Sequence, residues 1–335
     1  MTLPAALIAF PVAVLVAWSV LAAGILDHPN ARSSHARPTP RGGGIGVLAG
    51  VFAALLVIPV TGPAEGAALA GTVLCGGMAA GLGLLDDLLT LSERLKFAVL
   101  TTLGLALSVM AGPVTGLGIA LPWIVGLAGS ALWVFTVANA VNFMDGSDGL
   151  LTATLIPAAL ALGLLADGGT ADASLALAAG LAGFAVWNAP LLRPRGRLFC
   201  GDVGSLGIAV IFAGLALHWA ATAPAGSVWL APLLILPLLG DVLLTMAARV
   251  RAGRSPFVAH RAHAYQLLIR MGKSHARIAA IWGGLSLACG ALALAGAAGG
   301  AWVKFAVFAI GVAAFAIIHR VVRKMAMAAG LDVYQ

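Results

Sequence analysis

Charged residues are scarce in this sequence. Asp, Glu, Lys and Arg make up 9% of its 335 residues, whereas a soluble domain has about 25%. Hydrophobic residues make up 61% of the chain, and the mean hydropathy is +1.04. This scarcity excludes an ordinary soluble domain and predicts a polytopic membrane protein. The net charge of +7 requires no nucleic-acid partner, because the positions of the basic residues follow membrane topology.

The sequence also has few cysteines, no cleavable signal and no polar linker. Cys75, Cys200 and Cys289 have no metal-binding spacing, and two of them lie inside apolar runs, which argues against a disulfide framework and a cysteine zinc site. The first apolar run, 3–26, is too long for a signal-peptide core and has no basic residue ahead of it, so we expect a retained helix. With no internal repeat, residues 1–335 form a single predicted domain.

What the chain has in abundance is apolar runs. A helix needs about 20 apolar residues to cross the hydrocarbon core of a bilayer, and the Ala, Gly and Leu content suits close helix packing in lipid. We therefore expect an all-α membrane bundle of about eleven transmembrane helices, with ten as the alternative. The runs cover residues 3–26, 43–61, 66–85, 96–112, 118–138, 150–166, 172–187, 203–222, 228–247, 278–298 and 301–319.

The basic residues are distributed very unevenly among the connections. All but one of the 19 Lys and Arg residues follow odd-numbered runs, and the exception is Lys304 in the eleventh run. By the positive-inside rule, the odd-numbered connections are cytoplasmic, the N-terminus lies outside and the C-terminus lies inside. The polar motifs occupy the same connections, namely 27–42, 86–96, 139–149, 188–202 and 248–277. The sequence therefore predicts a site at the inner membrane face.

The densest motif lies between the fifth and sixth runs. It contains Asn139, Asn142, Asp145 and Asp148 together with two glycines. Polar groups at the end of a membrane helix are costly unless they bind something or line a wet cavity. Glycines let the backbone turn sharply and approach a ligand closely. We interpret this stretch as part of a binding site, and the alternative is a polar turn at a helix end.

Two further carboxylate motifs are expected on the same side. Asp86 and Asp87 end the third run, where their mutual repulsion is relieved by a magnesium ion or a phosphate-bound metal. The alternative is a solvated helix end paired with Arg94 or Lys96. Asp202 opens the eighth run, either as a metal-binding carboxylate beside exposed backbone N–H groups or as a helix N-cap.

The first connection contains a candidate anion site. The glycines at 42–44 can expose backbone N–H groups at the start of a helix. Basic residues precede them in the same loop, at Arg32, Arg37 and Arg41, together with His35. A basic loop that only sets the topology is the alternative interpretation.

The longest connection contains His260, Arg261 and His263. If the segment is helical, the two His side chains share a face. We favour a pyrophosphate-binding cluster over a zinc site, for which no third ligand is evident. An interfacial amphipathic helix without a ligand is the alternative. Asp241, close to the membrane interior, is either functional or paired with a basic residue such as Arg249.

These motifs, in this order, resemble those of the polyprenyl-phosphate N-acetylhexosamine-1-phosphate transferases. This family includes the phospho-MurNAc-pentapeptide translocase and the transferases that initiate O-antigen and related polysaccharides. The resemblance covers nearly the whole chain. It rests on the loop from Asp27 to Gly44, on Asp86-Asp87, on Asn139 to Leu150, on Phe199 to Ser205 and on the His260–Gln266 loop.

The resemblance implies a fold, a reaction and a set of roles. The fold would have ten or eleven helices, in the inner membrane of a bacterium, with the site facing the cytoplasm. The reaction would transfer a phospho-sugar from a UDP-N-acetylhexosamine to undecaprenyl phosphate, with Mg²⁺ or alternatively Mn²⁺ as the cofactor. A homodimer is one possible oligomeric state. Asp202 would bind the metal, with Asp86 and Asp87 at the lipid-phosphate end and one of them a candidate base. The uridine pocket would contain Phe199, stacking on uracil, together with Asn188, Asp145, Asp148, Asn139 and Asn142, and the diphosphate would be held by His260, Arg261 and His263.

The sequence departs from the family pattern at two places. Thr90 stands where the family has the third Asp of its Asp-Asp-x-x-Asp motif, which removes any role carried by that carboxylate. His-Arg-Ala-His-Ala-Tyr-Gln replaces the three-histidine motif of the peptidoglycan enzyme, which resembles the O-antigen-initiating branch and argues against a MurNAc-pentapeptide donor. N-acetylglucosamine, N-acetylfucosamine and N-acetylquinovosamine donors all stay open.

Two other functions compete with this one. An intramembrane prenyltransferase also uses paired Asp motifs, but the second half of this chain offers one Asp and a basic His loop instead of a second acidic motif. A transporter or flippase for an anionic solute would spread its ionisable residues through the membrane midplane near broken helices. Here we expect them to crowd the inner face.

Overall fold

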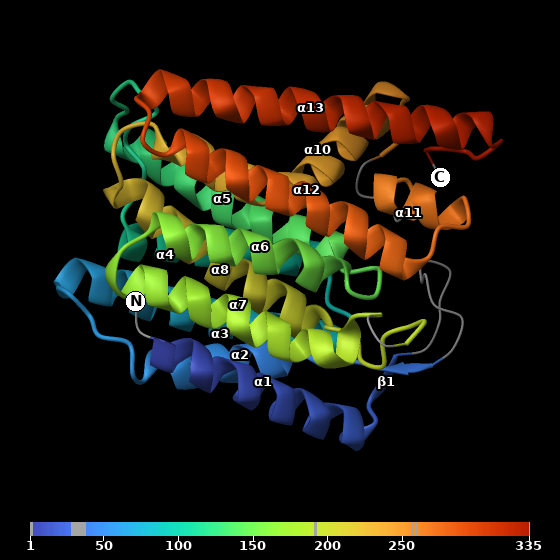
Figure 1. Ribbon diagram of the computed structural model, residues 1–335, viewed down its shortest axis with the longest axis horizontal. Coiled ribbons are helices and arrows are strands. Elements are labelled where there is room, and N and C mark those ends of the chain that lie inside the picture. Colours follow the sequence, from blue (N-terminus) through green and yellow to red (C-terminus); the bar gives the residue numbers. More distant parts are fainter. Residues whose placement is uncertain (1–2, 28–37, 191–192, 256–257, 259, 335) are drawn as a thin grey trace.

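Long helices that lie side by side make up most of the molecule (Figure 1). The computed structural model describes residues 3–27, 38–190, 193–255, 258 and 260–334. This architecture confirms the predicted all-α polytopic bundle. The helices are α1 (Leu3–Ala23), α2 (Gly44–Leu55), α3 (Pro63–Leu89), α4 (Glu93–Ala111), α5 (Trp123–Met144), α6 (Leu150–Leu165), α7 (Gly168–Asn188), α8 (Asp202–Thr222), α9 (Leu230–Leu234), α10 (Leu236–Arg251), α11 (Ala264–Arg270), α12 (His275–Gly296) and α13 (Ala301–Ala328), with a 3₁₀ turn η1 (Ser227–Trp229).

Each predicted apolar run coincides with helix in the structure, but the helices differ in length. Within the described residues, eight helices are long and apolar enough to cross a membrane, and the count becomes nine if the bent pair formed by η1–α9 and α10 is one span. Helices α2 and α6 are shorter, with 12 and 16 residues. At 1.5 Å per residue, 12 residues reach only about 18 Å, so the number of spans stays a prediction.

The two short helices nevertheless lead from one end of the bundle to the other. The first residue of α2, Gly44, touches Gly204 at the start of α8. The chain beyond α2 reaches Gly169 at the start of α7, which is the opposite end. In the same way α6 begins beside Asn188, the last residue of α7, and its last residue, Leu165, accepts a hydrogen bond from Trp219 near the end of α8. The alternation of ends that the charge pattern predicts is therefore present.

The pair formed by η1–α9 and α10 is bent by 81° between α9 and α10. Pro237 lies in the first turn of α10, where it lacks the N–H needed to continue a helix from α9. Trp282 of α12 donates its indole N–H to the carbonyl of Pro237, so a neighbouring helix fixes the position of the break.

Helix α8 forms the centre of the bundle. Its most apolar window is 94% buried inside the protein, against 22% for α1 and 17% for α13, so α1 and α13 present most of their surface to the surroundings. Burial of α8 depends on close approach of its neighbours. A Cβ added to Gly44 would lie 2.2 Å from the Cα of Gly204, so α2 and α8 can meet at this point only through glycines.

One end of the bundle contains both short strands. Strands β1 (Leu26–Asp27) and β2 (Thr39–Pro40) pair antiparallel there, at the same end of the bundle as α11 (Figure 1, right). The N–H groups of Gly43 and Gly44 donate to the carbonyls of Phe199 and Cys200, so these two groups, expected to bind an anion, are used within the protein. The predicted basic residues Arg32, His35 and Arg37 lie outside the described residues.

Candidate functional site

A cleft of about 500 Å³ opens at this end of the bundle. Each of the five connections predicted to converge contributes to its wall. The converging connections thus bring together polar groups that are far apart in the sequence. Nine predicted site residues line the cleft: Asp86, Asp87, Asn139, Asn142, Asp145, Asp148, Asn188, Phe199 and Asp202.

Two cations lie against the Asp86–Asp87 pair. Lys96 Nζ is 2.8 Å from Asp86 Oδ2, and Arg41 Nη1 is 3.2 Å from Asp87 Oδ1. Asp86 also accepts a hydrogen bond from the N–H of Leu91. The pairing with Lys96 proposed as an alternative is therefore present, but both carboxylates face the cleft. Their side chains are only 9% and 12% exposed, so the cations are needed to offset the cost of enclosing them.

Asp202 comes close to this pair because α3 and α8 approach backbone to backbone. A Cβ on Gly83 would lie 2.2 Å from the carbonyl oxygen of Asp202, one turn before the Asp pair. Asp86 and Asp202 are in hydrogen-bonding contact, which two carboxyl groups achieve only with a proton or cation between them. Asp87 accepts from the N–H of Val203 in the first turn of α8. The three carboxylates therefore share one cleft, as predicted.

The residue at the start of α8 has a different role from the N-cap considered above. Gly201, with φ of 76°, is the cap residue, and Asp202 is the first residue of the helix. Asp202 makes no cap bond; its Oδ1 accepts from Asn142 Nδ2 at 3.0 Å. Asn142 Nδ2 also donates to Ser205 Oγ. The amide of the Asn-x-x-Asp motif thus holds the Asp202 carboxylate toward the cleft.

Asp145 is the carboxylate with the most unfavourable surroundings. Withdrawal from solvent, and then the negative charges of Asp202, Asp87 and Asp148, raise the pKa of Asp145 to about 8. No hydrogen bond or ion pair to its side chain is found within the described residues. A group in this state binds a proton or a cation readily, which is common at functional sites.

Asp148 and Asn188 shape the other side of the cleft. The amide of Asn188 accepts from Gly149 N–H at 2.9 Å and donates to the Leu198 carbonyl at 3.0 Å. Asp148 Oδ2 accepts from Gly196 N–H at 3.0 Å. These polar atoms fix the path of two loops, so the roles in uridine binding predicted for the two residues stay predictions. Asn139 donates to the carbonyl of Phe135 in its own helix.

The His260–His263 segment is not helical, because helix α11 begins at Ala264 and His263 caps it. His260, Arg261 and His263 are not among the residues that line the cleft. The two His rings lie 4.9 Å apart. Burial, then the charges of His263 and Arg249, lower the pKa of His260 to about 3, so His260 is neutral and a weak partner for a diphosphate.

His263 contacts a buried carboxylate instead. Its Nδ1 lies 3.7 Å from Asp241 Oδ1, and His319 Nε2 lies at the same distance from that atom. Asp241 also accepts from the N–H groups of Ala264 and Tyr265 at the start of α11. Arg249, proposed as its partner, donates to the carbonyl of Ser255 instead, so that pairing is wrong. Asp241 therefore anchors α11 beside the cleft.

Three cleft residues were missed in the sequence. Arg195 was interpreted only as a topological charge, and Gln266 and His275 were not considered, yet all three line the cleft. The signal for His275 was its place directly after Ser274, which caps α12, on the same side as the other motifs. A polar residue at the start of α12 therefore lies at the same end of the bundle as the site.

The chain is similar in sequence to a family model and to several known proteins. Residues 69–220 match the model of glycosyl transferase family 4. A decaprenyl-phosphate N-acetylglucosaminephosphotransferase of Mycolicibacterium smegmatis is 33% identical over 76% of this chain and 71% of its own length. The undecaprenyl-phosphate α-N-acetylglucosaminyl 1-phosphate transferase of Yersinia pestis is 32% identical over 85% and 81%, and that of Escherichia coli K12 is 30% identical over 74% and 70%.

The chain belongs to glycosyl transferase family 4, the polyprenyl-phosphate N-acetylhexosamine-1-phosphate transferases. This membership confirms the resemblance and makes the protein a phosphosugar transferase of the membrane. It sets aside the prenyltransferase and the transporter. In this transferase Thr90 stands at the position of the missing third Asp, and Asp86 is paired with Lys96.

Proposed function

We propose that this transferase moves N-acetylglucosamine-1-phosphate from UDP-N-acetylglucosamine to a polyprenyl phosphate, such as undecaprenyl phosphate, and releases UMP. The observation that carries the proposal is the cleft in which Asp86, Asp87, Asp145 and Asp202 converge, with Arg41 and Lys96 as their partnering cations among the described residues. The relatives named above act on N-acetylglucosamine phosphate and polyprenyl phosphates, which favours this sugar among the three left open.

A divalent cation such as Mg²⁺, or Mn²⁺ in its place, fits the cleft. Carboxylate oxygens are the ligands that Mg²⁺ prefers, and it is usually held by one or two carboxylates together with substrate phosphates. Asp202 and Asp145 have no cationic partner among the described residues, and they are the donors that we assign to it. No three His, Cys, Asp or Glu side chains of the described residues already form a complete metal site, which suits an ion shared with a substrate.

The transfer joins two anions, so their repulsion is the main obstacle. When bound, the ion would neutralise charge on the transferring phosphate. Arg41 and Lys96, fixed at the rim by Asp87 and Asp86, place positive charge beside the incoming lipid phosphate.

Bond making and breaking follow from this placement. An oxygen of the lipid phosphate forms a bond to the sugar-proximal phosphorus of the donor, and the bond from that phosphorus to the bridging oxygen breaks, so UMP leaves with that oxygen. The lipid phosphate is largely ionised at neutral pH, because its second pKa is about 6. Asp86 and Asp87, candidate bases in the sequence, therefore serve chiefly to position the cations, and alignment of the two phosphates supplies much of the rate.

The site would face the cytoplasm of a bacterium, at the inner membrane. Support comes from the basic residues of the connections at the cleft end and from UDP-sugars being cytoplasmic substrates. The product would start a cell-surface polysaccharide such as O-antigen. A cysteine introduced at Arg251 should resist a membrane-impermeant thiol reagent in intact cells and react in inverted vesicles; labelling in intact cells would contradict this orientation.

The substrate assignment is tested with purified protein in lipid nanodiscs. UDP-N-acetylglucosamine, UDP-N-acetylfucosamine and UDP-N-acetylquinovosamine are each supplied with undecaprenyl phosphate and Mg²⁺. We expect UMP release and lipid-linked product with the first donor, and loss of both with EDTA. A preference of more than about tenfold for another donor would overturn the choice of sugar, and product formation without any divalent cation would overturn the assigned metal.

A further inference from the structure

His275 lies in the wall of the cleft, and no role has been assigned to it so far. It is the first residue of α12, and its side chain is 12% exposed. Two hydrogen bonds connect it to the motif between α5 and α6. Its Nδ1 lies 2.9 Å from Ser147 Oγ and accepts from the backbone N–H of Asp148 at 3.1 Å.

These contacts determine which ring nitrogen carries the proton. A backbone N–H can only donate, so Nδ1 must be the unprotonated acceptor. The neutral imidazole then carries its proton on Nε2. Nε2 forms no hydrogen bond with any of the described residues. His275 therefore presents one N–H donor that the protein itself does not use, on a ring that lines the cleft.

The surroundings indicate what this donor can bind. Arg195 and Gly196 line the cleft on the same side, and Asp148 Oδ2, the nearest carboxylate oxygen, is 3.9 Å from Nδ1 and already accepts from Gly196 N–H. Asp86 and Asp87, by contrast, are held by Lys96 and Arg41. The His275 side thus carries the unused Nε2–H and Arg195, whereas the cations of the Asp86–Asp87 side are already held by the two carboxylates.

We propose that His275 Nε2–H donates a hydrogen bond to an acceptor oxygen of the nucleotide half of the sugar donor, either on the uracil ring or on the phosphate nearest the ribose. This inference rests on the proposed use of a UDP-sugar. His275 is then a substrate-binding residue, and its Nδ1 aligns it with the Ser147–Asp148 turn. It takes the place in the cleft that the sequence had suggested for His260 and His263.

Two substitutions separate substrate contact from a purely positioning role. In His275→Asn, the side-chain oxygen occupies the place of Nδ1 and keeps the bond to Asp148 N–H, but the distal donor is lost. In His275→Gln, the amide reaches the place of Nε2 and keeps a distal donor, but the Nδ1 acceptor is lost. We measure KM for both substrates, kcat, and the Kd values of UMP and uridine, in nanodiscs.

We expect His275→Asn to raise KM for the UDP-sugar and Kd for UMP by about tenfold, since one hydrogen bond to a charged or strongly polar group is lost. KM for polyprenyl phosphate should change less than about twofold. If the Kd of uridine also rises tenfold, the acceptor lies on uracil. If only the Kd of UMP rises, the acceptor lies on the phosphate. Both results support the contact. His218→Asn, a buried histidine at the opposite end whose Nδ1 contacts the Ala111 carbonyl, is the matched control.

Two outcomes overturn the inference. If His275→Asn binds UMP like the wild type while His275→Gln does not, His275 only positions the turn. If both variants bind UMP like the wild type, it has neither role. The proposed function fails separately, by the wild type showing no turnover of UDP-sugars.

Discussion

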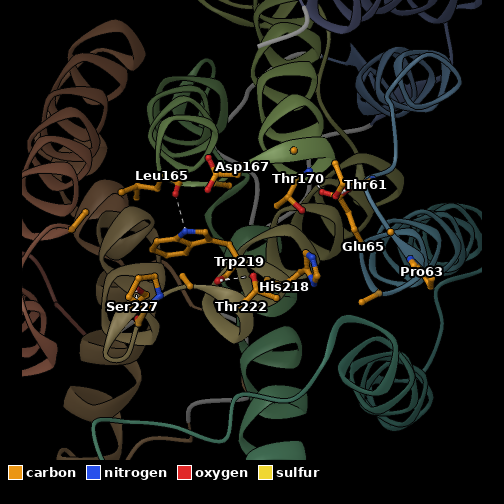
Figure 2. A pocket seen from close by; sticks show the side chains of 17 residues that line it. Thr61, Pro63, Glu65, Leu165, Asp167, Thr170, His218, Trp219, Thr222 and Ser227 are labelled. Atoms are coloured by element: carbon orange, nitrogen blue, oxygen red, sulfur yellow. Dashed lines mark hydrogen bonds between the residues drawn. The ribbon is translucent and has the colours of Figure 1, made fainter.

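Pockets lined by carboxylates occur at both ends of this bundle, and the carboxylates are satisfied in different ways. The pocket opposite the cleft has a volume of about 580 Å³ and contains Glu65, Asp167 and His218 (Figure 2). Glu65 accepts hydrogen bonds from the N–H and hydroxyl of Thr61 and from the N–H groups of Gly169 and Thr170. In the cleft, the part of the chain that the structure describes provides no such donors for Asp145, and for Asp202 it provides Asn142 and the carboxyl of Asp86.

This difference separates a structural carboxylate from a reactive one. Glu65 accepts hydrogen bonds from the exposed N–H groups at the start of α7, which is the ordinary role of an acidic residue at a helix N-terminus. The cleft instead gathers negative charge that the protein does not neutralise by itself. Pocket size does not distinguish the two ends, whereas unbalanced charge does. Substitutions at the two ends should therefore act on different properties.

The largest effect is expected for Asp202→Asn. The variant should insert and fold like the wild type, but UMP release should fall by about 10³-fold, because the carboxylate assigned to the divalent ion is lost. The rate is measured under saturating Mg²⁺ and both substrates, with the yield of folded protein from size-exclusion chromatography as the control. Turnover like that of the wild type would refute the assignment of Asp202.

A smaller loss is expected for Asp241→Asn. Asp241 holds the start of α11 through two backbone N–H groups, and the Tyr265 hydroxyl of α11 packs against Gly146 in the cleft loop. Removing the charge should lower kcat/KM by about tenfold. Thr245→Val removes a hydroxyl that donates to the same carboxylate and should cost less activity than Asp241→Asn. An equal loss in the two variants would contradict the anchoring role.

Glu65→Gln should change stability and leave catalysis intact. The neutral amide accepts fewer of the four hydrogen bonds, which should cost about 1–3 kcal/mol of unfolding free energy. The specific activity of the folded protein should stay within about twofold of the wild type. Thermal unfolding and UMP release, measured on one preparation, test both statements. A large loss of specific activity would mean that the two ends are coupled.

The last prediction is a pH dependence of stability from Asp145, measured without divalent ions. Because its pKa is raised to about 8 in the folded protein from about 3.9 in an unfolded chain, the folded state holds the extra proton between these values. Stability therefore falls as pH rises through this window. Asp145→Asn removes this dependence. The unfolding midpoint of the variant minus that of the wild type should therefore increase from pH 5 to pH 8. A constant difference over that range would contradict the raised pKa.

Much of the fold and half of the site follow from the sequence for a simple physical reason. Apolar length determines the helices, and basic charge determines which connections share a side. Asp86, Asp145 and Asp202 could therefore be placed at one end without any knowledge of packing. The structure adds that they share a cleft.

The remaining parts depended on contacts between distant segments. His263 seemed available to a ligand because its partner, Asp241, lies in another helix, α10, 22 residues earlier in the chain. His275 gained its place through Ser147, which is far away in the sequence. Periodicity and charge count cannot reveal such pairings, because they are determined by tertiary packing.

The central claim is that Asp202 and the nucleotide together hold a divalent ion at the cleft. Binding of Mn²⁺, followed by electron paramagnetic resonance with and without UDP-N-acetylglucosamine, tests it most directly. The account predicts one Mn²⁺ site that tightens with the nucleotide, persists in Glu65→Gln and is lost in Asp202→Asn. Equal Mn²⁺ binding by Asp202→Asn and the wild type would contradict it.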